Sequence, residues 1–569
     1  MLLALLLGAV LVGCMGPTPE DLTPAPTPEP TPTRQPPPAA ESGLDVDLPV
    51  TRSALQDIRE RGEMRVGVLY NYPPFGSLAE NGDLMGYEVA LVQQIAERWE
   101  VDVTFVQVTR QTRLEMLLTG EVDMLAAAVP HTRDLEQFVD FSQTTFRSGA
   151  VPTVRTGSGI TEMADLSASP VTVVSSEVAS RVQQAYAQAA LTPPTMTVVD
   201  SLDTAAEALT AEAGTVAVLG QREQMILLAE QVPNVEIPDM FVYVQPYAFA
   251  VRQGDTPLRD LLNLTLQQIA AEGDYGEIFR NNIYGYAADI LEELPGEPAY
   301  TFATMPAELP DEQTTIERLR AGEPLRVAGM DLTSEPEPFD SQPIVDGFNR
   351  AVINEMARRW GVPVVEITDS VGEEGLGLLM DGDADLVVGI RPDLGLVGDV
   401  AFTQPYYQRA LRLINMNDVT VNGVGDLNFR PAFALTPVDV STDLIERNNG
   451  FPQVETAESL EAAFDTLLLR AIDAIVTDEY IAALMIEADD RIEMYPVRYR
   501  PTDQVMGLPA ADSDFQALVN FTLQDMAQDG TLEELAVRYF APYRPEDEEI
   551  ETFSPEIWPG EGGYLGFGQ

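Results

Sequence analysis

The stretch MRVGVLYNYPPFGSLAENGDLMGYEVALVQQIAERW, residues 64–99, decides the fold of this chain. It opens with a short apolar run at 64–70, which is typical of a buried strand, and closes with a helical pattern at 88–99. Strand-like and helix-like segments keep alternating afterwards, at 101–108, 113–121 and 122–129. This alternation predicts an α/β fold in which helices cover a mainly parallel sheet.

The same order of segments returns near residue 325, with LRVAGMDL, then FNRAVINEMARRWG, then ADLVVGI. Matching motifs keep an offset of about 260 residues, as an internal repeat requires. FSQ at 141–143 pairs with FTQ at 402–404, and LTLQQIAAEGDYGEIF pairs with FTLQDMAQDGTLEELA. We therefore predict two tandem copies, module 1 at 51–290 and module 2 at 317–545, joined by a linker at 291–316 that is rich in proline and acidic residues.

The two ends of the chain differ in composition from the modules. Residues 1–13 are an apolar run that stops at Gly13, directly before Cys14, and this resembles a bacterial lipobox. The resemblance implies a lipoprotein signal peptide and a lipid on Cys14, whereas an uncleaved anchor helix would need about twenty apolar residues. Residues 14–50 are a proline-rich tether, and 546–569 are predicted to be an acidic, solvated and irregular tail.

Composition excludes several classes of function. The formal net charge of −58 makes nucleic acid an implausible partner. The chain contains no lysine, which excludes Schiff-base chemistry, and its single histidine and single cysteine favour neither a metal site nor a cofactor. Neither a G-x-S-x-G elbow nor a phosphate-binding G-x-x-x-x-G-K loop is present. We therefore expect a binding protein and not an enzyme.

The two copies are similar to the type 2 periplasmic binding proteins of the family 3, polar amino-acid binding class. In module 1 the likeness rests on residues 64–99, LTGEVDMLAAAVPHTRDLEQFVDFSQTTF and VYVQPYAFAVRQGD. In module 2 it rests on LRVAGMD, GFNRAVINEMARRWG, DGDADLVVGIRPD, VAFTQPYY and AIDAIVTDEY. The resemblance implies two lobes per module, joined by two crossing strands, with a ligand held between them by hinge closure. The crossings would lie near 149–155 and 243–252, and near 409–413 and 504–509.

The resemblance also implies where a ligand would be held, although neither module keeps the arginine that binds an amino-acid carboxylate in this family. Leu135 and Leu396 stand at that position. In module 1 the remaining candidates are of three kinds. Tyr72 and Phe75 would cover the ligand with aromatic rings, and Gln221 would meet it at the end of a second-lobe strand. His131, Thr132 and Arg133 lie in the loop after the third strand.

In module 2 the candidates combine both charges. Arg391 opens a loop directly after an apolar strand, where it would meet an anionic group, and Asp478 stands where the family receives a ligand ammonium group. Phe339, Gly389 and Asp393 complete the set. For each candidate, ordinary packing or a solvated loop position is the alternative interpretation.

The predicted function is that of an extracytoplasmic lipoprotein that captures a small polar solute, such as an amino acid, for an ABC transporter permease. It would be held at the cell surface or in the periplasm by the lipid on Cys14. Two alternatives stay open. The protein could be a ligand sensor or surface scaffold whose clefts have degenerated, and, less favoured, a dehydratase-like enzyme on the same fold.

Overall fold

The apolar run that opens module 1 forms strand β1 (Glu63–Leu69), and the helical pattern after it forms α2 (Tyr87–Trp99). In the computed structural model β1 pairs in parallel with β5 (Asp102–Val108) and β6 (Met124–Pro130). The structure describes residues 51–211, 215–283, 291, 294–309, 315–331, 333, 337–368, 370–421, 423, 426–427, 431–435, 454–455, 457–543 and 555–560.

The main sheet of module 1 runs in the order β5-β1-β6-β12-β7-β10-β8-β9. Its centre is the antiparallel pair of β7 (Val139–Arg155) and β12 (Tyr243–Arg252). β10 (Ala217–Gln221), β8 (Pro170–Val174) and β9 (Thr195–Val199) continue the sheet on the other side. Because β7 and β12 take part on both sides, they are the two crossing strands that join a first lobe (β1, β5, β6) to a second lobe (β8, β9, β10).

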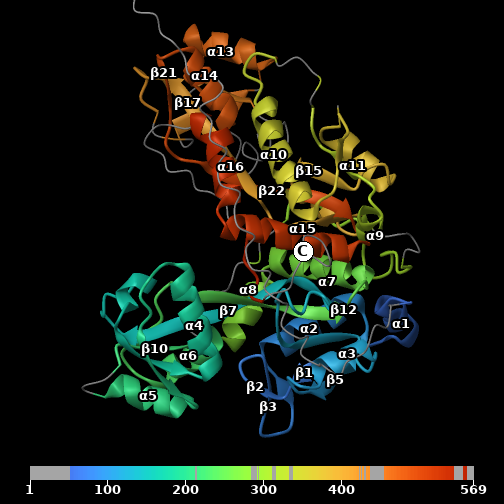
Figure 1. Cartoon of the computed structure of the whole chain (residues 1–569), viewed down its shortest axis with the longest axis vertical. Helices are drawn as coiled ribbons and strands as arrows, with labels where there is room; N and C mark the ends of the chain where they lie inside the picture. Colours follow the sequence, from blue (N-terminus) through green and yellow to red (C-terminus); the bar gives the residue numbers. More distant parts are fainter. Residues whose placement is uncertain are drawn as a thin grey trace, which may run out of the picture. The chain divides into compact units, whose positions relative to one another are not determined.

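Helices cover each lobe separately, and Figure 1 shows α2 and α3 near β1 and β5, and α4, α5 and α6 around β10. The first lobe has α1 (Ala54–Arg61), α3 (Arg113–Leu118), α7 (Thr256–Ala271) and α8 (Asp274–Asn282) besides α2. The second lobe has α4 (Ser176–Gln188), α5 (Leu202–Thr210) and α6 (Arg222–Gln231). Short strands β2 (Asn71–Tyr72), β3 (Gly76–Leu78) and β4 (Leu84–Met85) form a small sheet, and β11 (Val235–Glu236) pairs with β7.

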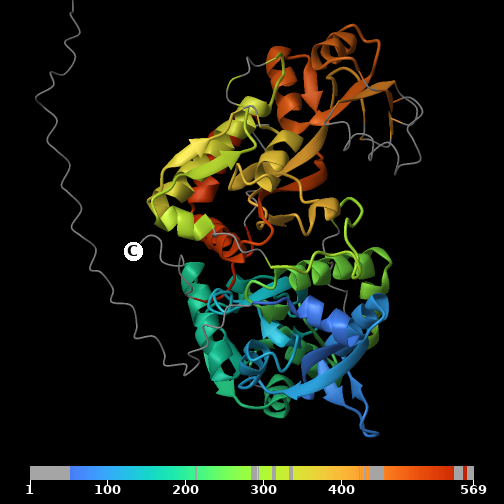
Figure 2. The same ribbon diagram turned by 90° about the vertical axis from the view of Figure 1, so that its right-hand side faces the viewer.

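Module 2 repeats this topology strand for strand, in the order β14-β13-β15-β22-β17-β20-β18-β19. Its crossing strands are β17 (Tyr407–Met416) and β22 (Tyr499–Pro509). In Figures 1 and 2 the yellow and orange segments of this module form separate groups of helices and strands. The first lobe is built from β13 (Leu325–Ala328), β14 (Val364–Glu366), β15 (Leu386–Ile390), β16 (Val400–Phe402), α9 (Thr315–Arg320), α10 (Gln342–Trp360), α11 (Glu373–Met380), α15 (Ser513–Gln528) and α16 (Thr531–Phe540).

The second lobe of module 2 is built from β18 (Ala432–Leu435), β19 (Val454–Glu455), β20 (Ala474–Asp478), β21 (Ile492–Met494), α13 (Leu460–Leu468) and α14 (Glu479–Ala488). The predicted α/β fold, the tandem copies and the two lobes per module are thereby confirmed. The limits given above for the modules and the linker stay predictions.

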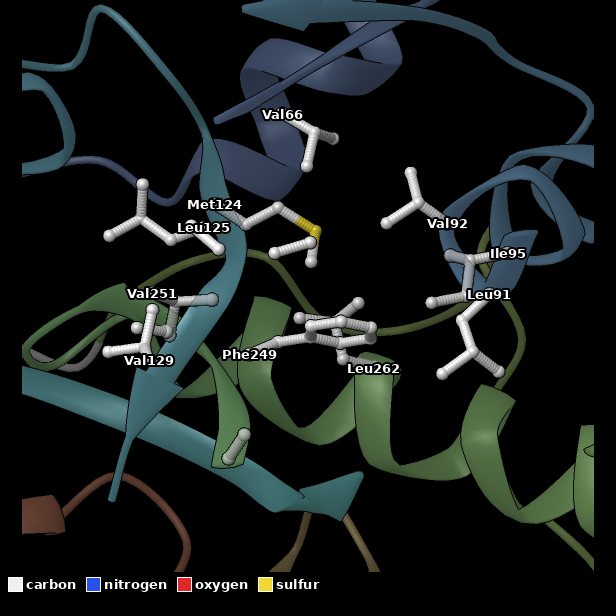
Figure 3. Close-up of a cluster of buried hydrophobic side chains, with 14 of the residues drawn as sticks. Val66, Leu91, Val92, Ile95, Met124, Leu125, Val129, Phe249, Val251 and Leu262 are labelled. Atoms are coloured by element: carbon white, nitrogen blue, oxygen red, sulfur yellow. The ribbon is translucent and has the colours of Figure 1, made fainter. Parts of the chain in front are cut away.

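Each lobe of module 1 has its own hydrophobic core, because its helices turn apolar stripes toward one face of the sheet. The first-lobe core gathers side chains from β1, β6, β12, α2 and α7, and Figure 3 shows Phe249 of β12 with Leu262 of α7 beside it. The second-lobe core forms around Val173 of β8, Val182 of α4 and Leu219 of β10. Separate cores let each lobe keep its shape if the angle between the lobes changes.

Polar contacts recur at equivalent positions of the two modules. The indole nitrogen of Trp99 in α2 donates to Thr265 Oγ1 in α7 at 2.9 Å, and Trp360 in α10 donates to Thr522 Oγ1 in α15 at 2.9 Å. In both pairs the side chains are buried, and the helices that they join occupy equivalent places in the two modules. The repeat therefore extends from sequence motifs to individual hydrogen bonds.

The ends of the chain are described only in part. The predicted signal peptide, the predicted tether and Cys14 lie outside the described residues. Among the described residues, no helix combines the length and the apolar character needed to cross a membrane. The expectation of a solvated tail is wrong for 555–560, where Trp558 is only 7 % exposed and packs against Phe521. A tryptophan ring has enough apolar surface to dock an otherwise polar segment.

The paired Trp–Thr bonds make a test of the repeat. Trp99→Phe and Trp360→Phe should each lower the free energy of unfolding by a similar amount, about 1 kcal/mol for the lost hydrogen bond plus the loss of part of a buried ring. Urea unfolding of each variant, followed by tryptophan fluorescence and circular dichroism, measures this. A large effect in one module and none in the other would contradict the equivalence.

Candidate functional site

A buried carboxylate joins the two lobes of module 1. Glu223 lies in the first turn of α6, in the second lobe, and is fully buried. Its Oε1 accepts from the hydroxyl of Tyr72 in β2, in the first lobe, at 2.7 Å, and from that of Tyr247 on crossing strand β12 at 2.9 Å. Ser148 Oγ on the other crossing strand, β7, donates to Oε2. Three hydroxyl donors thus satisfy the carboxylate where the lobes and the crossing strands meet.

The electrostatics of this cluster keep its phenols protonated. Burial, and then the charge of Glu223, raise the pKa of Tyr72 and the pKa of Tyr247 above the ordinary tyrosine value. Glu223 lies in the first turn of α6, at the positive end of the helix dipole. Arg110 lies over the ring of Tyr72, with its guanidinium carbon 4.5 Å from the ring centre. In the structure the hydroxyl groups and the carboxylate of this cluster bond to one another.

Sequence analysis did not single out Glu223. The available signal was the position of an acid two residues after Gln221, at the start of a helix that follows a second-lobe strand. Gln221 itself ends β10, and its Nε2 donates to Gln245 Oε1 at 3.0 Å. Ser148 Oγ lies 3.5 Å from Gln221 Oε1, so Gln221 and Tyr72 belong to one connected polar cluster.

Phe75 borders this cluster. It is fully buried in the first-lobe core, and its ring centre lies 5.8 Å from that of Tyr72, 5.5 Å from that of Tyr247 and 5.0 Å from that of Phe146. Thr132 Oγ1 accepts from the backbone of Leu135 at 3.2 Å, a contact within its own turn.

His131 and Arg133 make contacts with the second module and the tail. The ring of His131 stacks between Phe141, at 4.2 Å, and Trp558, at 3.9 Å. Arg133 Nη1 donates to Asp525 of α15 at 2.6 Å. Both side chains line a cavity of about 1490 Å³ whose wall includes residues 555–560 of the tail. Neither Tyr72 nor Glu223 is among the residues that line this cavity.

A second buried acid supports the loop after β6. Both oxygens of Glu88, in the first turn of α2, accept from the backbone nitrogen of Ala128, at 3.0 and 2.9 Å. Arg113 donates to the carbonyl groups of Ala127 and Ala128 at 2.7 and 3.1 Å. Burial raises the pKa of Glu88 to about 7, although the Ala128 amide and the Arg113 charge act in the opposite direction. This residue holds the backbone beside the interlobe region in a left-handed turn, with φ of 45° at Ala128.

Module 2 carries an ion pair between its lobes. Asp478, at the end of β20 in the second lobe, accepts from Arg409 Nε through Oδ2 at 3.0 Å and from the backbone of Tyr480 through Oδ1 at 3.0 Å. Arg409 Nη2 donates to Ser341 Oγ, which precedes α10 in the first lobe, at 3.3 Å. The sequence prediction placed Arg391 and Asp478 at the two charged ends of one ligand. In the structure Asp478 forms its ion pair with Arg409, on crossing strand β17.

Two further module 2 candidates lie near the interlobe region. Phe339 has φ of 64° and packs against Phe464 of the second lobe, with ring centres 4.6 Å apart. Gly389 takes the place in β15 that Ala128 takes in β6, and it also has positive φ, 65°. The nitrogen of Gly389 donates to the hydroxyl of Tyr406 at 3.0 Å, where the module 1 turn uses a carboxylate. The two modules therefore build the same turn with different chemistry.

Arg391 and Asp393 follow directly in the loop after β15. Arg391 is half-buried. The side chain of Asp393 caps the short helix Leu394–Leu396 by accepting from the nitrogen of Gly395 at 2.7 Å. Asp393 therefore has a structural contact in its own loop, and the structure does not bring it to Asp478.

The fold and these interlobe clusters define a class of protein: paired two-lobed modules of the hinged, solute-binding type. The family model described as bacterial extracellular solute-binding proteins, family 3, matches residues 64–284 and 327–542, which is more than half of the chain. The chain belongs to this family, and it carries two copies of the family module.

Curated relatives align with one module each. The chain is 26 % identical over 236 residues to the ABC transporter glutamine-binding protein of Bacillus subtilis strain 168, an alignment that covers 40 % of this chain and 84 % of the relative. It is 24 % identical over 239 residues to the L-arginine-binding protein of Pseudomonas aeruginosa PAO1, covering 39 % and 90 %. Among solved structures, an ancestral cationic amino acid solute-binding protein matches at 24 % identity with a TM-score of 0.36, covering 41 % of this chain and 100 % of that one.

The interlobe bond of Tyr72 gives a stability prediction. Tyr72→Phe should lower the free energy of unfolding of module 1 by about 1–3 kcal/mol, because one donor to a buried carboxylate is lost. The matched control is Tyr70→Phe, which removes a bond to the carbonyl of Phe105 within the first lobe and should cost about 0.5–1.5 kcal/mol. Urea midpoints compare the two, and equal small effects would argue against a special role for Tyr72.

Glu88 gives a pH prediction. Its pKa of about 7 in the folded protein exceeds the value of about 4.3 expected for an unfolded chain, so the folded state binds the proton more tightly. This stabilisation is complete below about pH 4.3 and is lost as the pH rises through 7. Relative to Glu88→Gln, the wild-type protein should therefore lose melting temperature between pH 4.5 and 7.5. A difference that does not change with pH would contradict the raised pKa.

Proposed function

We propose that this protein captures a small polar solute, an amino acid or a similar compound, outside the cytoplasm and delivers it to an ABC transporter permease. The observation that carries the proposal is the hinge architecture in both copies, two lobes joined by β7 and β12 and by β17 and β22, in a chain of the solute-binding family. The names of its relatives, a glutamine-binding and an L-arginine-binding protein, support a solute of amino-acid size.

The proposed ligand contacts lie where the two lobes face each other. In module 1 these are Tyr72 and Gln221, together with Glu223. Closure around a solute would remove water from these groups and strengthen each hydrogen bond to it. The closed shape is what a membrane partner would recognise, because a ligand shifts the population of whichever conformation it binds best.

In module 2 the proposed contacts are Phe339, Gly389 and Arg391, with Asp478 at the second-lobe side. Attachment to the membrane through a lipid on Cys14 is part of the same proposal and rests on the lipobox-like sequence. A soluble module on a proline-rich tether could then reach solutes and the permease from one anchored position.

A scaffold or sensor with degenerate clefts is the second candidate. It is favoured by the leucines at 135 and 396, where the family places its carboxylate-binding arginine. It is also favoured by the contacts that the clefts make internally, such as those of Glu223 with three hydroxyl groups. A binding measurement separates the two candidates.

The test is a melting-temperature screen of the purified chain against amino acids, amines and small organic acids. A ligand at 100 times its Kd should raise the melting temperature of the module that binds it by roughly 5–10 °C, because binding stabilises only the folded state. Gln221→Ala should remove a response that belongs to module 1, whereas Gln231→Ala, at the exposed end of α6, should keep it. A chain that responds to no compound would favour the scaffold, and a compound that is consumed would indicate an enzyme.

A further inference from the structure

The two modules differ in charge at one pair of equivalent positions. Counting seven residues from Phe141 and from Phe402 leads to Ser148 and to Arg409 on the respective crossing strands. The strand ends opposite them are Gln221 and Asp478. The register confirms the equivalence, because Gln221 pairs with Ala150 and Asp478 pairs with Leu411, each two residues beyond Ser148 or Arg409.

Both members of the pair have changed together. Module 1 has two neutral side chains, with Ser148 Oγ 3.5 Å from Gln221 Oε1. Module 2 has two opposite charges, with Arg409 Nε 3.0 Å from Asp478 Oδ2. The side chain of Asp478 is 6 % exposed and that of Arg409 is 21 % exposed. The carboxylate is therefore covered, and Arg409 is the more exposed member of the pair.

Asp478 presents little open surface to a ligand ammonium group, because its side chain is only 6 % exposed. One oxygen accepts from Arg409, and the other accepts from the backbone of Tyr480. An incoming ammonium group would lie beside the Arg409 guanidinium, and two positive charges close together are unfavourable in a site shielded from water. Module 1 has no such positive charge at Ser148 or Gln221.

Arg409, in contrast, retains donors. A guanidinium has five N–H groups, and the bonds described above use one on Nε and one on Nη2. The remaining three can meet a carboxylate, which arginine binds through two parallel hydrogen bonds. Ser341 brings the first lobe to the same guanidinium at 3.3 Å, so a ligand there would be met from both lobes.

We propose that the module 2 cleft receives a small carboxylate anion at Arg409 and excludes the ammonium group of an amino acid, and that Asp478 positions Arg409 without contacting the ligand. This inference rests on the proposed solute-binding function and names the ligand class of one of its two clefts. Module 1 has neutral side chains at the equivalent positions, so we do not expect it to exclude the ammonium group of an amino acid.

The test uses the full chain and isothermal titration with succinate and 2-oxoglutarate as anionic probes, and L-glutamine and L-arginine as amino-acid probes. Arg409→Ser should weaken binding of the anions at least tenfold. Asp478→Asn can keep the helix cap and leaves Arg409 charged but without the carboxylate that positions it, so it should weaken anion binding less than Arg409→Ser does. Neither substitution should change the affinity for amino acids.

Two controls separate ligand contact from folding. The double variant Arg409→Ser/Asp478→Gln installs the neutral module 1 pair and leaves no buried charge unpaired, so its loss of anion binding cannot be assigned to an unfolded module. Gln408 precedes Arg409 in β17, and its side chain donates to Asp503. Gln408→Ser should alter anion affinity less than twofold. Melting curves of every variant without probe report its folding.

Three outcomes would overturn the inference. Binding of an amino acid that falls tenfold in Asp478→Asn would make Asp478 a ligand contact and leave the proposed function standing. Anion binding that is unchanged in Arg409→Ser, or absent from the wild-type protein while amino acids still bind, would remove the inference alone. A chain that binds none of the probes and nothing in the wider screen would remove the proposed function together with it.

Discussion

The antiparallel pairing of two long strands is the constraint on which each module depends. β7 and β12 remain hydrogen-bonded from Val139 and Arg252 at one end to Ala150 and Tyr243 at the other. All other strands attach to one side of this ribbon or the other, and each lobe has its own hydrophobic core, although Ile226 of second-lobe helix α6 packs into the first-lobe core. A ribbon of two strands twists more readily than a packed sheet. Any change in the angle between the lobes is therefore concentrated in the β7–β12 pair.

Residues at the ends of this ribbon decide what each module can recognise. Ser148 in module 1 and Arg409 in module 2 project from equivalent places on a crossing strand, close to the first residues of the second lobe. Arg409 bonds to Asp478 in the second lobe and to Ser341 in the first, whereas Ser148 bonds to Glu223 and Gln221 in the second lobe. The charge of Arg409 therefore affects ligand selection and the interlobe contacts together, which explains why a change at one position is accompanied by a change at its partner, Gln221 or Asp478.

Much of the fold could be predicted from the sequence, because apolar periodicity and a constant repeat offset are local signals that the strands and helices must satisfy. The family resemblance added the crossing strands. The site was harder to predict. His131 and Arg133 lie in the expected loop, yet they contact Trp558 and Asp525, hundreds of residues away, and no local pattern announces such contacts. Glu223 was overlooked for the same reason, since its three donors come from three separate segments.

The union of both modules in one polypeptide has a consequence for the cell that carries it. The two modules are always made in equal numbers, whatever the level of expression. Because a short linker joins them, the effective concentration of one module near the other is on the order of millimolar. One copy can therefore differ from the other in its chemistry, as the unlike pairs Ser148–Gln221 and Arg409–Asp478 do, while both remain present in equal numbers.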